Sequence, residues 1–327
     1  MTTTRRSILA GLAACFLPPF TGGVSRASAR DEGGKCTPSK LAAMMGDYPH
    51  THALVTGAVA SPCIALDFAR VSAPAAAFAR TVAMEFDVSE LSLVTFLMAK
   101  AYGRDLVLLP AVNLSRFQHA YLVYDSSRGV MTPKDLEHAR IGTRLFTATT
   151  PSWLRGILAR DYGVNLDRVQ WSAWQAPNVP EYRDPPNVKR IAQADLAELL
   201  FSRQVDAIVA DPVPDDPRLK PVIADPGAAA KAWAAKNHAI QINHMVVVKR
   251  DIAERDPETV REVWRMMKES KRRAGAGAGG DPEFTPFGLA ANRRNLEAAI
   301  DYIYATGVLP RRPSVDELFH PITASLT

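Results

Sequence analysis

The chain has 327 residues, of which 47% are hydrophobic and 22% are charged, and its formal net charge is +5. Three of the excess positive charges lie in the first 29 residues, at Arg5, Arg6 and Arg26, so the remainder carries a net +2. This length and hydrophobic content suit one large or two medium globular domains, and the weak net charge excludes the basic pattern of a nucleic-acid-binding protein.

The first 29 residues have the pattern of an export signal. A twin-arginine pair, Arg5 and Arg6, precedes an apolar run from Ile8 to Phe20, and Ala27, Ser28 and Ala29 form a small-residue cleavage site. These are the three parts of a cleaved signal of the twin-arginine route. We therefore expect the mature chain to begin near Arg30 and to be exported in a folded state.

Two other interpretations of this segment stay open. A membrane-spanning helix is the first, although two glycines and two prolines interrupt a run that is shorter than the ~20 apolar residues a bilayer requires. The second is a lipoprotein signal, because Leu12 to Cys15 resembles a lipoprotein cleavage box that would leave Cys15 anchored to lipid. Apolar residues continue past Cys15, which argues against this anchor.

Cysteine is rare in the rest of the chain. Only Cys36 and Cys63 remain after processing, and no Cys/His spacing typical of a structural zinc site is present. A disulfide between the two is compatible with an oxidising compartment, but the sequence does not show how far apart they lie.

Short apolar runs alternate with longer amphipathic ones along the chain. This is the pattern of an α/β protein with mostly parallel strands and crossover helices. A proline-rich stretch, Ala176 to Pro186, is expected to be a loop over one face. The predicted strands are Ile64–Val71, Leu106–Asn113, Ala120–Tyr124, Arg140–Phe146, Val169–Trp174, Val205–Ala210 and Met245–Lys249.

Capping residues mark two helices that matter for the site. Ser89 is predicted to cap a helix that ends at Gly103, and Thr149 or Thr150 to cap a second that ends at Gly163. The first turn of a helix has unpaired N–H groups and the positive end of the dipole, which favour a bound anion.

Polar residues near these two helix starts are the candidate ligand-binding groups. In the first half of the chain Ser92 joins Ser89, while Arg116 and His119 follow the strand that ends near Asn113. Arginine binds a carboxylate through two parallel hydrogen bonds, and histidine can donate a further one. An ion pair with a nearby acid is the alternative role of Arg116. The remaining candidates are Arg144, Thr147, Thr150 and His244.

Motifs of covalent catalysis, nucleotide binding and metal binding are missing from the sequence. There is no G-x-S-x-G, H-E-x-x-H or Walker sequence, which argues against a hydrolase or an NTPase. Asp47, His50 and His52 have a spacing that metal ligands can show, but no further ligand completes the set. We therefore expect neither a metal nor an organic cofactor.

Several segments resemble one protein family. They are Phe86 to Ser92, Ser115 to His119, Met131 to Gly142 and Val205 to Ile208, and the similarity extends from about Leu41 to Phe319. They resemble the type II periplasmic solute-binding fold, in the branch that contains 4,5-dihydroxyphthalate decarboxylase and substrate-binding proteins of ABC transporters. The resemblance implies an α/β protein of two lobes, with mixed, mostly parallel sheets and a ligand cleft between the lobes.

The resemblance also implies where the lobes and their walls lie. Lobe one would be discontinuous, 30–125 plus 243–327, with lobe two at 126–242 and crossings near Tyr124–Val130 and His238–His244. Ser89, Ser92, Arg116 and His119 would then line lobe one, Arg144, Thr147 and Thr150 would line lobe two, and His244 would lie beside the hinge. Phe117, Phe146 or Trp153 would pack on an aromatic ligand.

Two functions fit the resemblance best, and a sensor or scaffold protein that uses the same fold without transport is a third alternative. The first is a periplasmic protein that binds a small, aromatic carboxylate by lobe closure and delivers it to a membrane permease of an ABC transporter. The second is a cofactor-independent decarboxylase of a dihydroxylated aromatic diacid, in which His119 or His244 protonates the ring carbon. The export signal favours the first, because catabolic enzymes of aromatic rings act on cytoplasmic intermediates.

Overall fold

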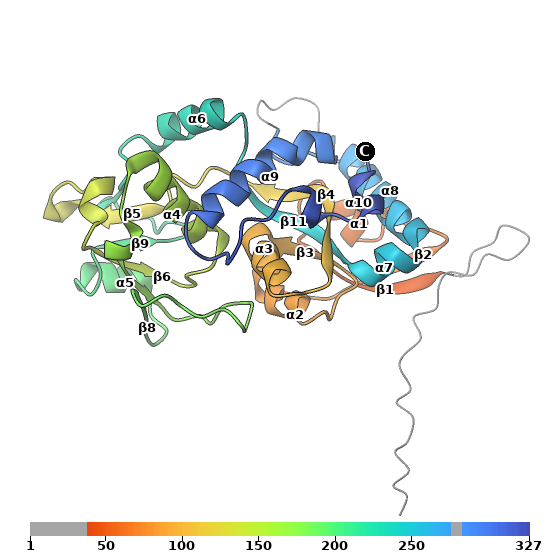
Figure 1. Cartoon of the computed structure of the whole chain (residues 1–327), viewed down its shortest axis with the longest axis horizontal. Coiled ribbons are helices and arrows are strands. Elements are labelled where there is room, and N and C mark those ends of the chain that lie inside the picture. The colour runs from red at the N-terminus through yellow and green to blue at the C-terminus, as the bar shows by residue number, and fades with distance from the viewer. Residues whose placement is uncertain (1–37, 276–282) are drawn as a thin grey trace, which may run out of the picture.

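The computed structural model describes residues 38–275 and 283–327 (Figure 1). The predicted export segment, the lipid-anchor alternative at Cys15 and also Cys36 lie outside the described residues. Cys63 is disulfide-bonded. No helix within 38–275 or 283–327 has both the length and the apolar character needed to cross a membrane.

The first lobe is a five-stranded sheet between two layers of helices. The strands have the order β2-β1-β3-β11-β4; β1 is parallel to β2 and β3, and β11 is antiparallel to β3 and β4. Alternate residues of β11 enter two separate cores, Val247 under one helix layer and Val246 under the other. The strands are β1 (Ser39–Met44), β2 (Ile64–Phe68), β3 (Val88–Ser92), β4 (Leu106–Ser115) and β11 (Ile242–Lys249).

Two groups of helices cover the faces of this sheet. One layer contacts β3 and β11 and consists of α2 (Phe78–Val82), α3 (Leu93–Ala101) and α9 (Leu289–Tyr304). The other layer packs around α8 and consists of α1 (His52–Val55), α7 (Arg250–Arg255), α8 (Pro257–Arg273) and α10 (Pro321–Ala324).

The second lobe is a six-stranded sheet in the order β10-β5-β9-β6-β7-β8. The strands β9, β6, β7 and β8 are parallel neighbours, and β5 is antiparallel to β9 and β10. The strands are β5 (Leu122–Asp125), β6 (Arg140–Thr143), β7 (Gln170–Ala173), β8 (Val188–Arg190), β9 (Ala207–Val209) and β10 (Leu219–Pro221), and the helices are α4 (Thr149–Tyr162), α5 (Leu196–Phe201) and α6 (Pro226–Asn237). The predicted class, two mixed and mostly parallel sheets flanked by helices, is confirmed.

Every predicted strand has a counterpart in one of the two sheets, but the start of the first predicted helix was wrong. Residues Val88–Ser92 form strand β3, and α3 begins only at Leu93. Ser92, whose side chain accepts a hydrogen bond from the backbone N–H of Thr95, is the N-cap in place of Ser89. Strand pairing with β1 and β11 overrides the helical periodicity of this stretch, since both neighbours bond to β3.

Two segments cross between the lobes, and they lie side by side. The first runs from Ser115 to Leu122, because β5 already belongs to the second sheet; the predicted crossing at Tyr124–Val130 is therefore too late in the chain. The return crossing lies between α6 and β11. Backbone N–H groups of Arg116 and Gln118 donate to the backbone and side chain of Gln241, at 3.2 and 2.7 Å.

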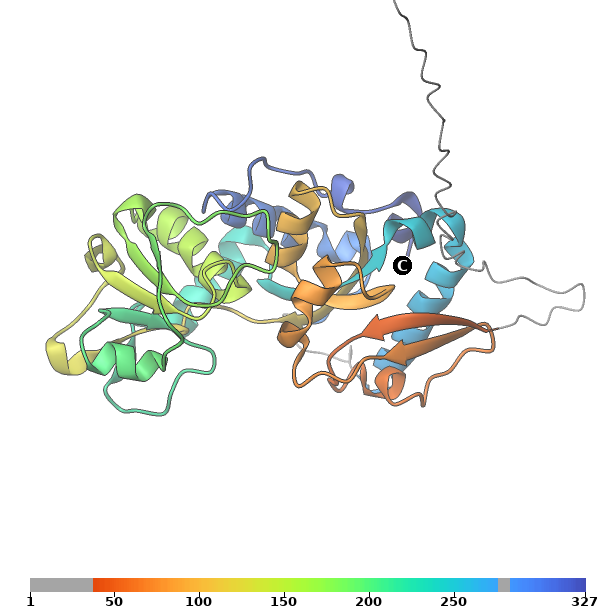
Figure 2. The same cartoon turned by 90° about the horizontal axis from the view of Figure 1, so that it is seen from below.

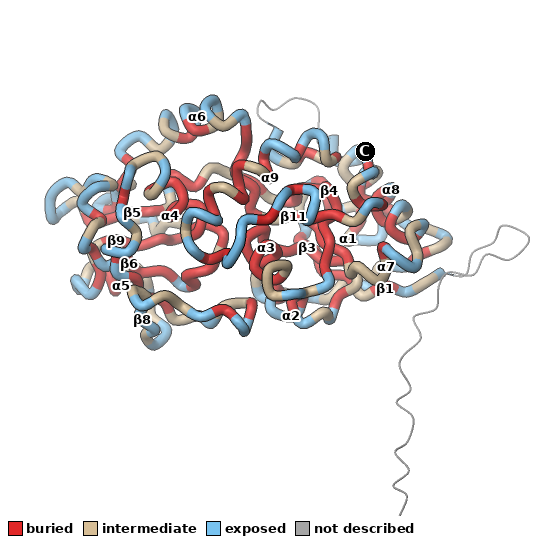
Figure 3. The backbone as a smooth tube through the Cα atoms, viewed as in Figure 1, coloured by how far each residue is buried: buried red, intermediate tan, exposed pale blue. Residues whose placement is uncertain are grey.

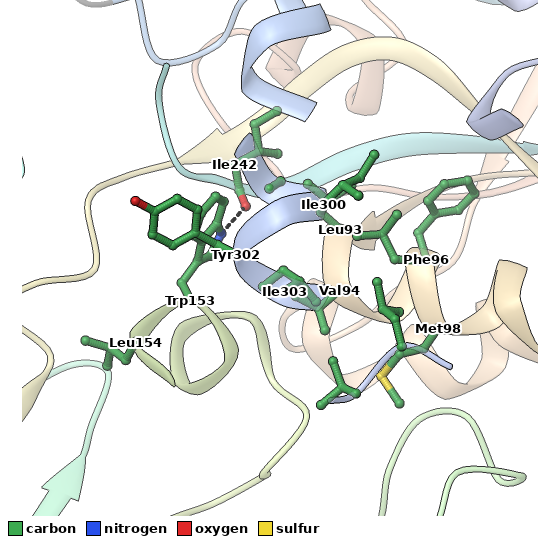
Figure 4. Close-up of a cluster of buried hydrophobic side chains, with 14 of the residues drawn as sticks. Leu93, Val94, Phe96, Met98, Trp153, Leu154, Ile242, Ile300, Tyr302 and Ile303 are labelled. Carbon is green, nitrogen blue, oxygen red and sulfur yellow. Dashed lines mark hydrogen bonds between the residues drawn. The ribbon is translucent and has the colours of Figure 1, made fainter. Parts of the chain in front are cut away.

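A single apolar core continues across the junction between the lobes (Figure 4). Trp153 of α4 is fully buried, and its indole N–H donates to the carbonyl oxygen of Ile242 at 2.9 Å. The same indole packs against Trp233 of α6 and Tyr302 of α9, with ring centroids 5.6 and 5.8 Å away. Figure 3 shows buried residues following the strands of both sheets and the helices between them. The lobes thus meet through packed helices as well as through the crossings.

The proline-rich stretch forms a long loop of lobe two that reaches lobe one (Figure 2). Asn178 donates to the hydroxyl of Thr95 in α3 at 3.2 Å. Glu181 forms an ion pair with Arg104, which follows α3, at 2.5 Å. This loop is therefore a third connection between the lobes, made by side chains and not by the main chain.

We expect Gly156→Ala to destabilise the junction, because a Cβ at Gly156 would lie 2.5 Å from the carbonyl oxygen of Tyr302. Backbone atoms of α9 cannot move aside as a flexible side chain would, so the free energy of unfolding should fall by about 1–3 kcal/mol. Chemical denaturation measures the change. Gly227→Ala is the control, since its nearest neighbour is 3.6 Å away. Equal stability of both variants would contradict the tight α4–α9 contact.

Candidate functional site

A buried carboxylate organises one end of the sheet in lobe one, where β1, β3 and β4 have their carboxyl ends. Glu90, in the middle of β3, has no solvent exposure and accepts four hydrogen bonds. Oε1 accepts from the hydroxyl of Tyr48 at 2.7 Å and pairs with Nδ1 of His244 at 2.6 Å. Oε2 accepts from the backbone N–H of Gly46 at 2.8 Å and from Nδ2 of Asn113 at 3.3 Å. We call Tyr48, Glu90, Asn113 and His244 the Glu90 cluster.

Strand topology explains why these four residues meet. Tyr48 follows the carboxyl end of β1, Glu90 lies in β3, and Asn113 lies near the carboxyl end of β4. Strand β11 lies between β3 and β4 and runs in the opposite direction, so His244 near its start lies at the same edge. Ligands of open α/β sheets bind outside the carboxyl ends of the strands.

The protonation states within the cluster follow from burial and from the hydrogen bonds. Burial favours the neutral acid, but the hydrogen bonds from His244, Gly46 and Tyr48, together with the charge of His244, lower the pKa of Glu90 below its ordinary value. Burial and the adjacent Glu90 raise the pKa of Tyr48 far above its ordinary value. The carboxylate is therefore ionised and the phenol protonated at neutral pH. Buried charge of this kind requires full hydrogen bonding.

His50 belongs beside the cluster and not to a metal site. Its ring stacks on Tyr48, with centroids 5.5 Å apart and planes 5° apart, and is buried. Burial, together with the charge of Lys271, lowers the pKa of His50. Asp47 and His52, in contrast, pair with each other at 2.8 Å on the exposed surface. The three residues whose spacing could suit a metal therefore do not converge.

Arg116 lies where the lobes meet. It forms an ion pair with Asp211 of lobe two, and its guanidinium lies 4.6 Å from the ring centroid of Tyr121. Its charge also acts on Tyr48, which places it near the Glu90 cluster. Nε of Arg116 is buried without a protein partner. The open alternative for this arginine, an ion pair with an acid, is thus observed, but with an acid of the other lobe.

Two predicted residues of lobe two line a pocket of about 330 Å³ that also includes Asp211. Arg144 contributes an exposed side chain and Thr150 lies in the first turn of α4. Neither Thr149 nor Thr150 caps α4, because Ala148 occupies the cap position and both threonines are already helical. Since Asp211 bonds to Arg116, this pocket adjoins the lobe junction.

Other predicted residues have structural surroundings. Ser89 is buried, and its hydroxyl bonds to the hydroxyl of Thr81 at 2.8 Å and to the carbonyl oxygen of Glu90 at 3.0 Å. Thr147 is buried just before α4. Phe146 and Trp153 are core residues, 3% and 0% exposed, so of the three aromatic candidates only Phe117 is partly accessible.

His119 lies in the first crossing segment, between β4 and β5. It lines a pocket of about 290 Å³ with Arg160, Asp161 and Trp233, at the contact of α4 with α6. Its side chain is 2% exposed, and Nδ1 has no protein partner. Burial lowers the pKa of His119 to about 4, so the ring is neutral at pH 7. His119 and His244 therefore have different surroundings, a pocket with Arg160 and Asp161 in one case and Glu90 in the other.

The fold of this chain resembles that of solved binding proteins. The alkanesulfonate-binding protein SsuA of Xanthomonas axonopodis pv. citri superposes with a TM-score of 0.52 over 86% of this chain and 98% of its own, at 15% identity. The chain has the type II periplasmic-binding-protein fold. A ligand-binding component of an ABC-type import system from Staphylococcus aureus gives a TM-score of 0.51 over 88% of this chain and 98% of its own, at 9% identity.

The sequence of the chain is distantly similar to the sequences of two enzymes. A 4,5-dihydroxyphthalate decarboxylase of Comamonas testosteroni is 24% identical over 281 residues, which cover 72% of this chain and 83% of the relative. One of Pseudomonas putida is 24% identical over 169 residues, 46% of this chain and 63% of the relative. No protein-family model matches the chain. The predicted resemblance, at the level of the fold with distant similarity to the decarboxylases, is confirmed.

Sequence reasoning missed the centre of the site. Of the Glu90 cluster only His244 was predicted, while Tyr48, Glu90 and Asn113 were not. One signal was available, because Glu90 is an acid within a run of small and apolar residues from Val88 to Val94, where a charge requires partners. The identity of those partners depends on the order of strands in the sheet, which no local pattern reveals.

Stability should depend on pH through His119. Its pKa is lowered from 6.5 to about 4 in the folded chain, so between these values the unfolded chain binds more protons. The resulting contribution of His119 to the free energy of unfolding is complete above pH 6.5. It falls by up to about 3 kcal/mol as the pH decreases towards 4. Denaturation of the wild type and of His119→Leu at several pH values tests this. The variant should lose part of the slope between pH 4 and 6.5, with pH 8 as the reference for packing. Parallel slopes would contradict the assignment.

Proposed function

We propose that the chain is an exported, periplasmic solute-binding protein of an ABC-type uptake system that closes its lobes over a small, aromatic carboxylate. The observation that carries this proposal is the pairing of Arg116 with Asp211 across the lobe junction. An arginine at this position gains a bidentate partner when a carboxylate enters, and closure needs only a higher affinity for the closed state. Asp211 then acts as the internal competitor of the ligand.

The surroundings of Arg116 support a carboxylate ligand. Its unpaired Nε leaves one donor unused, and Arg144 and Thr150 line the adjoining pocket. Phe117, whose ring lies 5.6 Å from that of Phe284, supplies a partly accessible aromatic surface near the same segment. The binding of such a ligand requires no cofactor. The proposed partners are this ligand, the permease that receives it and the twin-arginine machinery that exports the folded chain.

Thermal unfolding in the presence of aromatic and aliphatic carboxylates tests the proposal. A ligand present at 100 times its dissociation constant should stabilise the wild type by about 2.7 kcal/mol. Arg116→Ala should abolish this stabilisation because the charged anchor is lost. Arg293→Ala is a matched control, since Arg293 pairs with Asp316 on the surface of lobe one. A full shift in Arg116→Ala, or no shift with any carboxylate, would argue against the proposed function.

The second candidate is decarboxylation, and the pairing of His244 with Glu90 favours it. A carboxylate bonded to Nδ1 orients the imidazole and leaves Nε2 free, which is the arrangement of an oriented acid or base. His244, whose side chain is 15% exposed, would deliver a proton to the ring carbon of the substrate. The bond between this carbon and the substrate's carboxylate breaks at the same time, and carbon dioxide leaves. The distant similarity to 4,5-dihydroxyphthalate decarboxylases supports this candidate.

Release of carbon dioxide from 4,5-dihydroxyphthalate by the purified chain distinguishes the two candidates. If the chain only binds, we expect no turnover above the uncatalysed rate. If it is an enzyme, turnover should fall by on the order of 10²-fold or more in His244→Ala, because general acid catalysis contributes this much. His52→Ala, at an exposed histidine, serves as the control. Turnover that survives in His244→Ala would exclude this mechanism.

A further inference from the structure

Neighbouring residues direct their hydrogen-bond donor groups towards Glu90. Each of its two oxygens has two protein partners, so its acceptor positions are filled and it does not contact a ligand. The single proton of Tyr48 is directed to Oε1. The ring of His244 likewise directs Nδ1 to Oε1.

Two buried acceptors beside Glu90 have no protein donor. Asn113 directs Nδ2 to Glu90, and its carbonyl oxygen Oδ1 is buried without a partner in a residue that is 1% exposed. Nε2 of His50 is likewise buried without a partner in a residue that is 7% exposed. The backbone of Asn113, as a hydrogen-bond partner of the His50 ring, opposes the lowering of the pKa of His50, so the two residues are neighbours in the fold.

Unpaired buried acceptors are rare in folded proteins, since more than nine in ten buried polar groups have a partner. The cost of leaving one unpaired is comparable to that of a lost hydrogen bond. Asn113 and His50 therefore indicate a donor that is supplied from outside the protein chain. At the lobe junction the unpaired group is of the opposite kind, the Nε–H donor of Arg116.

We infer that the wall formed by Tyr48, His50 and Asn113 selects ligands that carry hydroxyl or amino donors in addition to the carboxylate, and that Glu90 sets this selectivity by accepting hydrogen bonds from the protein's own donors. The inference rests on the proposed role of Arg116 as the carboxylate anchor. A carboxylate without O–H or N–H groups pairs with Arg116 but leaves the buried acceptors unpaired. A carboxylate with O–H or N–H groups satisfies both ends of the site.

Calorimetric titration with matched pairs of carboxylates tests this. The pairs are benzoate with 3,4-dihydroxybenzoate and phthalate with 4,5-dihydroxyphthalate, and 3,4-diaminobenzoate separates amino from hydroxyl donors. We expect the donor-bearing member of a pair to bind on the order of tenfold more tightly. Equal affinities, or tighter binding of the plain acid, would overturn the inference while leaving carboxylate binding intact. Failure of every ligand to bind would overturn the proposed function, and the inference with it.

Variants assign the selectivity to named residues. His50→Phe keeps a ring against Tyr48 but removes the Nε2 acceptor, and Glu90→Gln replaces two acceptor oxygens by one acceptor and one donor group. In both, the affinity ratio within a pair should fall towards one. His52→Phe is the matched control and should keep the wild-type ratio, since His52 pairs with Asp47 at the surface. A purely structural role would lower both affinities equally and keep the ratio, which would overturn the assignment. His50→Phe tests the inference even if Glu90→Gln does not fold.

Discussion

A charged carboxylate enclosed in the first sheet is the constraint on which the candidate site depends. Glu90 can remain ionised there only because four donors surround it, and these donors come from three segments that are far apart in the chain. Removing any one would leave a buried charge partly unsatisfied. The loop after β1, the middle of β3, the end of β4 and the start of β11 are thus tied to one position. The carboxylate of Glu90 therefore couples the geometry of the candidate site to the stability of this end of the sheet.

The junction between the lobes combines rigid and breakable contacts. Trp153, Tyr302 and Ile242 form a buried contact of packed rings and one indole hydrogen bond. Arg116 with Asp211 and Arg104 with Glu181, in contrast, are partly exposed ion pairs between the lobes. Exposed pairs contribute little to stability, so they can be exchanged for contacts with a ligand at small cost. This division is compatible with the lobe closure that we propose.

The fold class was predictable because alternating apolar runs and caps are local features of the chain. The strand and helix types follow from periodicities of two and of 3.6 residues, and a sheet with helices on both faces is the packing that buries them. The error at Ser89 shows the limit of this reasoning. Both serines of that segment can cap a helix, and pairing of β3 with two neighbouring strands decided that Ser92 does so.

Candidate residues divide along the same line. Local chemistry was enough to select Arg116 and His244, since a guanidinium and an imidazole beside strand ends are useful in any α/β protein. It was not enough to separate His244 from His119, because the two differ only in what the folded chain places around them: Glu90 in one case, and a pocket with Arg160 and Asp161 in the other. Residue types and their periodicity are written in the local sequence, whereas strand order, and with it the partners of each buried charge, is a property of contacts between residues far apart in the chain.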